Sequence, residues 1–169
     1  PLGSILIWTQ LLRTGGLDEP ATVRALGMIE RSTETLQHFI EDLLDISRII
    51  AGKLSLEVRP TDVASVVQAA ADEAKPSVEG KSIEVVLSLD RELPPVSGDP
   101  ARLQQVLTNL LNNSAKYTDP GGRIGVLLER DGAEVVLRVQ DSGIGIASDM
   151  LPRIFDLFVQ AERRLDRSQ

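Results

Sequence analysis

Carboxamide side chains gather on one predicted helix near the middle of the chain. The segment Asn109–Tyr117 reads NLLNNSAKY and follows Asp99-Pro100, a natural helix start. With about 3.6 residues per turn, apolar side chains share one side of this helix: Leu103, Val106, Leu107, Leu110 and Leu111. Polar side chains share the other: Arg102, Gln105, Asn109, Asn112, Asn113 and Lys116.

This polar face admits two interpretations. It could simply be solvated, as polar helix faces usually are. Asparagine is a mediocre helix former, however, because its amide competes for backbone hydrogen bonds. Several asparagines beside a lysine therefore indicate oxygen ligands and a cation, a combination that suits a magnesium-bound phosphate chain.

A second candidate segment, Asp141–Ile146 (DSGIGI), directly follows a strand-like run. Alone it could be an ordinary glycine turn with Asp141 as acceptor at the end of the strand. Glycine also lets backbone approach a ligand closely, because it has no Cβ. The motif carries more weight beside the asparagine helix than it does alone.

The two segments together resemble the N box and G1 box of sensor histidine kinases, whose ATP-binding fold is of the gyrase and mismatch-repair type. The approach Asp99-Pro100-x-Arg102-Leu103-x-Gln105-Val106 fits the same family. Residues 40–48 resemble the second helix of its dimerisation and phosphotransfer domain, and residues 52–56 resemble the exit from that helix. Residues 155–158 resemble the F box, although Phe155 and Phe158 could equally be core residues. The resemblance covers nearly the whole chain.

This resemblance implies ATP and Mg²⁺ as cofactors and assigns nucleotide-contacting positions: Asn109, Asn113, Lys116, Tyr117, Asp141, Gly143 and Gly145. Asn113 would coordinate the metal, Lys116 would lie toward the phosphates, and Asp141 would accept the adenine amino group. Lys116 has an alternative role, because a lysine closing a helix C-terminus is favourable in itself.

No catalytic residue is assigned within the chain. The family phosphorylates a histidine in the pattern His-acid-Leu-Arg-x-Pro-Leu, which we expect just upstream of Pro1. Residues 1–4 are either native or a vector-derived remnant. His38 lies in the context His-Phe-Ile, at the outermost heptad position, and is expected to be a solvated surface residue. We expect the glycine-rich G2 box and the closing elements to lie beyond Gln169.

The family activity would be ATP- and Mg²⁺-dependent autophosphorylation of the upstream histidine, followed by transfer to an aspartate of a response regulator. Two alternatives remain. The chain could be a dimerisation and partner-docking module with a degenerate nucleotide fold, or part of a gyrase-like or chaperone-like ATPase. The second alternative does not explain the helical hairpin that the N-terminal third predicts.

That hairpin would pair a helix over residues 2–12 with a long helix that has Pro20 in its first turn and ends near Gly52. Apolar spacing of three and four forms a heptad seam in the long helix: Leu26, Ile29, Thr33, Leu36, Ile40, Leu43, Ser47 and Ile50. One hairpin cannot complete a four-helix bundle, so we expect a homodimer.

The expected fold class is α+β, with a helical hairpin at residues 1–53, a linker or strand at 54–61 and an α/β-sandwich ATP-binding domain at 62–169. Leu54, Leu56 and Val58 alternate like a short strand. A helix capped by Asp62, a strand around residues 83–87, the asparagine helix, a hairpin of strands 123–129 and 133–140, and a short helix near 150–155 complete a mixed sheet that is C-terminally incomplete.

Composition narrows the function classes. The 169 residues are 42% hydrophobic and 25% charged, as is ordinary for a globular protein. Aromatic residues are only 3%, so the core must be aliphatic. No apolar run approaches the roughly 20 residues of a membrane span, and the net charge of −7 gives no support for a nucleic-acid partner. Without cysteine there are no disulfides or thiolate metal sites. We expect a cytoplasmic location, with any membrane tether lying upstream.

Overall fold

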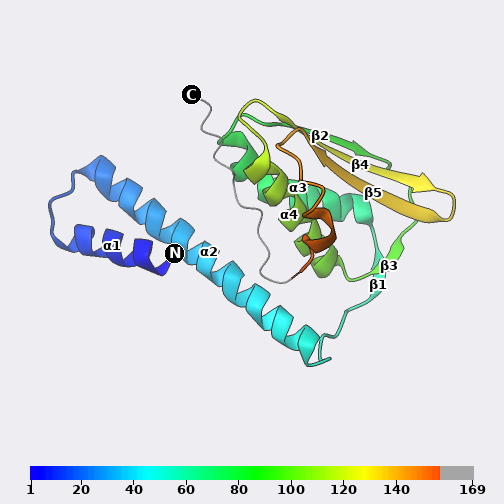
Figure 1. Cartoon of the computed structure of the whole chain (residues 1–169), viewed down its shortest axis with the longest axis horizontal. Coiled ribbons are helices and arrows are strands. Elements are labelled where there is room, and N and C mark those ends of the chain that lie inside the picture. The colour runs from blue at the N-terminus through cyan, green and yellow to red at the C-terminus, as the bar shows by residue number, and fades with distance from the viewer. Residues whose placement is uncertain (157–169) are drawn as a thin grey trace. The chain divides into compact units, whose positions relative to one another are not determined.

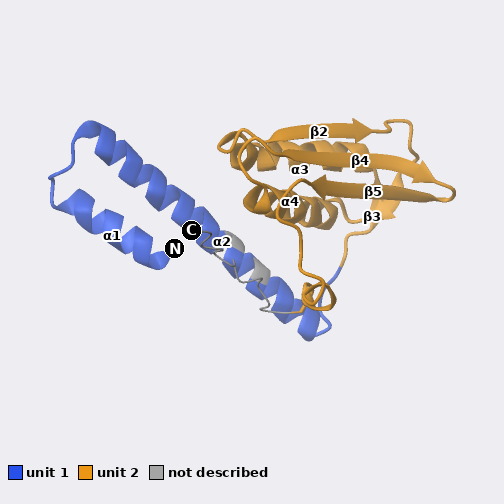
Figure 2. Cartoon of the chain, turned by 45° about the horizontal axis from the view of Figure 1, so that its top comes forward, with its two compact units in different colours: residues 1–55 blue, residues 56–169 orange. Residues whose placement is uncertain are grey.

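The computed structural model describes residues 1–156, apart from the side chains of His38 and Asp42, so the expectation for His38 lies outside the described part (Figure 1). The chain divides into two compact units, residues 1–55 and residues 56–169 (Figure 2). In the described residues, no helix combines the length and the apolar character needed to cross a bilayer.

The first unit is an antiparallel pair of helices, α1 (Leu2–Arg13) and α2 (Glu19–Ile50), which confirms the predicted hairpin (Figure 1). Asp18 caps α2, where its Oδ1 accepts a hydrogen bond from the Ala21 N–H at 2.8 Å. Beyond the end of α2, Gly52 adopts a φ of +62°, a conformation that glycine enters without steric penalty.

Much of the heptad seam is exposed in this hairpin. Leu26 is 54% exposed, Ile40 49% and Leu43 40%, whereas the small Ala25 is fully buried. Two helices cannot cover a stripe as wide as the one on α2, so the hairpin leaves several apolar side chains of the seam exposed.

The second unit contains a three-stranded mixed sheet of order β2-β4-β5, formed by β2 (Glu84–Leu89), β4 (Arg123–Asp131) and β5 (Glu134–Asp141). Strand β2 runs parallel to β4, and β4 pairs antiparallel with β5 through the predicted hairpin. The parallel pair requires a crossover connection, and this connection contains α4 (Pro100–Tyr117). A separate two-stranded ladder pairs β1 (Arg59–Thr61) with β3 (Val96–Gly98).

Helices α3 (Val63–Glu79) and α4 lie against one face of the three-stranded sheet (Figures 1 and 2). The core between helices and sheet is aliphatic, as the composition predicted. On β4, alternate side chains point into it, so that Ile124, Val126 and Leu128 are each at most 1% exposed. Helix α4 contributes Leu107 and Leu111.

Both predicted aspartate caps are confirmed. Asp62 caps α3, and the Ser65 hydroxyl and nearby backbone N–H groups lower the pKa of Asp62. The Oδ1 atom of Asp99 accepts hydrogen bonds from the first turn of α4, and its Oδ2 accepts one from the Glu57 N–H at 2.9 Å. The Glu57 N–H, followed by those of Arg102 and Ala101, holds the pKa of Asp99 below its ordinary value.

Local structure differs from the prediction at three places. Leu54, Leu56 and Val58 form no strand, because the ladder to β3 begins only at Arg59 and the side chains of Leu56 and Val58 are more than half exposed. Strand β3 was not predicted, since it is only three residues long and follows Pro94-Pro95. The short helix expected at 150–155 is a 3₁₀ turn, Leu151–Arg153. Phe158 lies outside the described residues, while Phe155 is 93% exposed and is therefore not a core residue in this unit.

Candidate functional site

The C-terminal end of α4 meets the glycine loop that follows β5. The Ser114 hydroxyl donates to Asp141 Oδ2 at 3.3 Å, and the Gly143 N–H donates to Asp141 Oδ1 at 2.9 Å. The Ile144 N–H donates to the carbonyl oxygen of Tyr117 at 3.2 Å. Segments more than 20 residues apart in the sequence are thus joined through one carboxylate and one helix-end carbonyl.

Strand alternation places Asp141 on this side of the sheet. Leu137 and Val139 pack against the core beneath the helices, and Asp141 continues the same face by the two-residue repeat of a strand. Unlike the two apolar residues, Asp141 is exposed, because β5 ends there and the loop turns toward α4.

The two glycines of the loop serve different needs. A Cβ on Gly143 would lie 2.6 Å from the Tyr117 carbonyl oxygen and 2.8 Å from Asp141 Oδ1, so only glycine fits there without moving backbone. Gly145 has open space around it but a φ of +69°, which disfavours most side chains. One glycine permits close approach and the other permits a left-handed turn.

The three asparagines of α4 do not act together. Asn112 is exposed on the same polar face, but its Oδ1 accepts a hydrogen bond from the Ser77 hydroxyl of α3 at 3.1 Å. Asn109 and Asn113 are exposed, and within residues 1–156 their amides make no hydrogen bond. Their oxygens are therefore available to a hard cation, and the donor set fits Mg²⁺ held by one protein oxygen together with phosphate and water. The described residues contain no cluster of three or more His, Cys, Asp or Glu that could hold a metal by itself.

Lys116 is exposed, and its ammonium lies 5.1 Å from the centre of the Tyr117 ring. Another lysine closes the helix: Lys81 Nζ donates to the carbonyls of Ala115, Lys116 and Thr118. Lys116 lies in the last turn of α4, where its charge is favourable as the alternative role expects, whereas Lys81 supplies the hydrogen bonds to the last carbonyls.

The apolar face predicted for α4 was partly wrong. Leu107 and Leu111 are buried as expected, but Val106 is 56% exposed and Leu110 44%. The buried face instead includes Thr108, Ser114 and Ala115, because the helix packs against α3 and the sheet through small side chains. Val106 and Leu110 share the helical spacing of Asn109 and Asn113, so they border the open amides.

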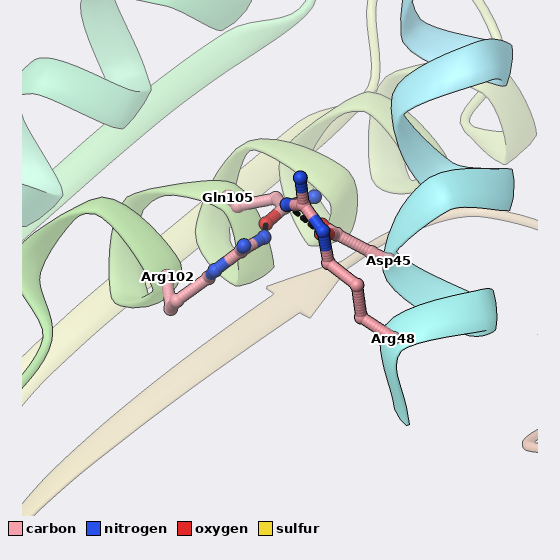
Figure 3. Close-up of polar contacts among 4 residues, drawn as sticks. All are labelled: Asp45, Arg48, Arg102 and Gln105. Carbon is pink, nitrogen blue, oxygen red and sulfur yellow. Dashed lines mark hydrogen bonds and ion pairs between the residues drawn. The ribbon is translucent and has the colours of Figure 1, made fainter. Parts of the chain in front are cut away.

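Arg102 and Gln105, which the helical wheel placed on the open polar face, interact with each other near the N-terminal end of α4. Arg102 Nη1 donates to Gln105 Oε1 at 2.7 Å (Figure 3). The figure also draws an ion pair one turn apart on α2, between Arg48 and Asp45, with an N–O distance of 3.7 Å. Both contacts join neighbouring turns of a single helix.

Sequence reasoning missed Ser114 and Lys81. Ser114 lies inside NLLNNSAKY, and a small hydroxyl on the buried side of an amphipathic helix was the available signal. Lys81 had no local signal, since it lies 34 residues before Ala115, whose carbonyl it binds most closely.

Two family models match the chain. Residues 1–52 match the His Kinase A (phospho-acceptor) domain, and residues 98–169 match the Histidine kinase-, DNA gyrase B-, and HSP90-like ATPase. The N-terminal match argues against a gyrase-like or chaperone-like ATPase, because it places the hairpin within the kinase architecture.

Similar proteins agree. The sensor protein GacS of Pseudomonas syringae pv. syringae is 37% identical over 99% of this chain and 19% of its own length. The structure of full-length ShkA in complex with AMPPNP is 30% identical, with a TM-score of 0.71, and covers 95% of this chain and 34% of that one. The histidine kinase ThkA in complex with the response regulator protein TrrA shares the fold, at 22% identity and a TM-score of 0.66, over 93% of this chain and 47% of that one.

The chain spans only 10% to 24% of the length of the curated relatives it matches. Across nearly all of its own length, however, the chain matches these relatives in sequence and in fold, and the two family models cover residues 1–52 and 98–169. A helical hairpin is followed by a mixed-sheet α/β unit in which an asparagine-bearing helix meets a DSGIG loop. The chain belongs to the sensor histidine kinases.

Proposed function

We propose that the second unit binds ATP with Mg²⁺ and that the intact protein uses it to phosphorylate a histidine upstream of Pro1. One observation carries this proposal: the Asp141 carboxylate is held beside the last turns of α4, whose Asn109 and Asn113 amides are open. A carboxylate that can accept from a base thus lies beside the helix turns whose amide oxygens can bind a metal.

Each site residue has a role that its chemistry supports. Asp141 accepts from the exocyclic amine of adenine, which guanine lacks at that position, and so selects the base. Gly143 lets the loop pack closely on α4, and Gly145 permits the left-handed turn that shapes the loop beside the ligand. Tyr117 and Asn109 contact the nucleotide from α4.

Asn113 and Lys116 serve the phosphate end of the site. The amide oxygen of Asn113 holds Mg²⁺, and Lys116 lies toward the phosphates, where its positive charge stabilises them. A magnesium ion held there would supply positive charge that offsets the charge developing on the phosphates during transfer.

The phosphoryl group would then pass from the histidine to an aspartate of a response regulator. The names of curated relatives as sensor kinases support this step, as does the solved complex of ThkA with its response regulator. The exposed apolar stripe of α2 supports a homodimer in which two hairpins form a four-helix bundle.

A titration of the 169-residue chain with a fluorescent ATP analogue, with and without Mg²⁺, tests nucleotide binding. Asp141→Asn should weaken binding at least about tenfold, because the amide replaces a charged acceptor with a neutral one. Asp131→Asn, at the far end of the β4–β5 hairpin, makes the same chemical change away from the site and should bind as the wild type does.

Wild-type chain that forms a dimer but binds no analogue would overturn the nucleotide assignment and favour the docking module. Equal affinities of Asp141→Asn and wild type would overturn the role of Asp141 while leaving ATP binding in place.

A further inference from the structure

Lys81 reaches from the turn between α3 and β2 to the last turn of α4. Its Nζ donates hydrogen bonds to the carbonyl oxygens of Ala115 at 2.7 Å, Lys116 at 2.9 Å and Thr118 at 3.0 Å. An ammonium group has three N–H donors, and here the same helix end accepts from all of them.

This contact meets a need of α4. The last carbonyls of a helix have no intrahelical partner, and a positive charge near them is favourable. The helix does not end in a glycine turn, because its C-cap residue, Thr118, is extended, with φ −90° and ψ 136°. A cation supplied by another segment therefore replaces the usual glycine cap.

The turn that carries Lys81 is itself fixed. The carbonyl of Lys81 accepts from the Gly121 N–H at 3.0 Å, and the Ile83 N–H donates to the Val78 carbonyl at 3.1 Å. Ser82 has a φ of +52°, in the left-handed region. A residue other than glycine stays in that region only where its surroundings over-determine it, so the side chain of Lys81 leaves from a rigid base.

The carbonyls of Lys116 and Thr118, which accept hydrogen bonds from Lys81, flank the carbonyl that supports the glycine loop. Tyr117 comes between Lys116 and Thr118, and its carbonyl accepts from the Ile144 N–H. Gly143 packs so closely on the same carbonyl that a Cβ would collide with it. The position of the loop is therefore set by the turn that Lys81 holds.

We propose that Lys81 is a positioning residue for the nucleotide site, which fixes the Tyr117 carbonyl on which the Gly143–Ile144 loop rests. It does not touch the nucleotide and acts through α4 and the loop. This inference rests on the proposed function and deepens it by adding a residue outside the α4 and glycine-loop motifs.

The test compares four variants of the whole 169-residue chain. Lys81→Met keeps the methylene stem and removes the ammonium, whereas Lys81→Arg restores a cation with several donors. Lys75→Met makes the same change at a lysine of α3 whose ammonium pairs with Glu79, at 3.8 Å on the surface. Val67→Ala, in the fully buried core, provides a control for general destabilisation.

Amide hydrogen exchange supplies a readout that needs no nucleotide. Lys81→Met should speed exchange at the Ile144 amide about tenfold relative to the β4–β5 ladder. The same variant should bind the ATP analogue about tenfold more weakly, and Lys81→Arg should recover part of the lost affinity. Lys75→Met should match wild type in both measurements, and Val67→Ala should speed exchange at Ile144 and in the ladder alike.

Unchanged relative protection of Ile144 in Lys81→Met, or equal loss at Ile144 and in the ladder, would overturn the positioning role. The positioning role would also be overturned if Lys81→Met bound the analogue as tightly as Lys75→Met does. If wild-type chain binds no analogue, the proposed function fails instead, and the exchange data still decide whether Lys81 holds the loop.

Discussion

The hydroxyl of Ser114, on the buried side of α4, donates to Oδ2 of Asp141 at the end of β5 across 3.3 Å. The other oxygen of the same carboxylate accepts from the Gly143 N–H at 2.9 Å. A carboxylate offers about four acceptor positions, so two remain after both oxygens have been oriented. Asp141 is thus held in one orientation while it keeps the capacity to accept from a ligand.

Removal of the Ser114 hydroxyl should loosen that orientation. Ser114→Ala is expected to weaken binding of an ATP analogue about threefold to tenfold, which corresponds to a net hydrogen-bond contribution of about 0.6–1.4 kcal/mol. Fluorescence titration measures the change. Ser77→Ala is the matched control. It also removes a hydroxyl that donates a hydrogen bond between two elements, from α3 to Asn112 of α4, but this contact lies outside the site. Identical behaviour of the two variants would show that Ser114 only packs.

The two loop glycines should respond differently to substitution. Gly143→Ala forces a Cβ against the Tyr117 carbonyl and should abolish measurable analogue binding. Gly145→Asn should retain it, since asparagine tolerates a φ near +69° better than most residues and the space is open. Normal binding by Gly143→Ala would mean that the loop does not hold its contact with α4 when the ligand is bound.

Acid should weaken the second unit through its two helix caps. The pKa values of Asp62 and Asp99 are lowered from 3.8 by hydrogen bonds that exist only in the folded state. The stability they give is therefore complete above the unfolded pKa and is lost as pH falls through the lower folded values. Thermal unfolding of the wild type should show a decline in midpoint below about pH 4. Asp99→Asn, which still caps but does not titrate there, should show a shallower decline. If the variant and the wild type had the same pH dependence, titration of Asp99 would not contribute to the loss of stability in acid.

A charge in the exposed seam of α2 should disrupt the proposed dimer. Leu43→Glu places a carboxylate on a side chain that is 40% exposed in the single hairpin and would be buried between two copies. Light scattering should report the monomer mass for this variant. Thr35→Glu lies on the exposed outer side of the same helix and should remain dimeric. A wild-type chain that is already monomeric at high concentration would contradict the four-helix bundle.

The sequence alone determined features that depend on neighbours along the chain. The caps at Asp62 and Asp99, the hairpin between β4 and β5, and the helical hairpin follow from short-range patterns of polar, apolar and turn residues. The N box and the DSGIG loop could likewise be recognised, because their residue types and spacing are local. That they would meet was a hypothesis drawn from the resemblance, since no short-range pattern relates them.

Only the tertiary structure decided which side chains of those motifs are open, which are buried and which bond to other segments. Asn112 turns to Ser77 while Asn109 and Asn113 remain open, although all three lie on one side of a helical wheel. Val106 and Leu110 are exposed while Ser114 is buried, because α4 is packed by the shape of its neighbours rather than by hydrophobicity alone. Lys81 closes the helix from a distant turn. Such contacts depend on how segments far apart in the sequence approach one another in space. A short-range pattern of residues does not encode that approach.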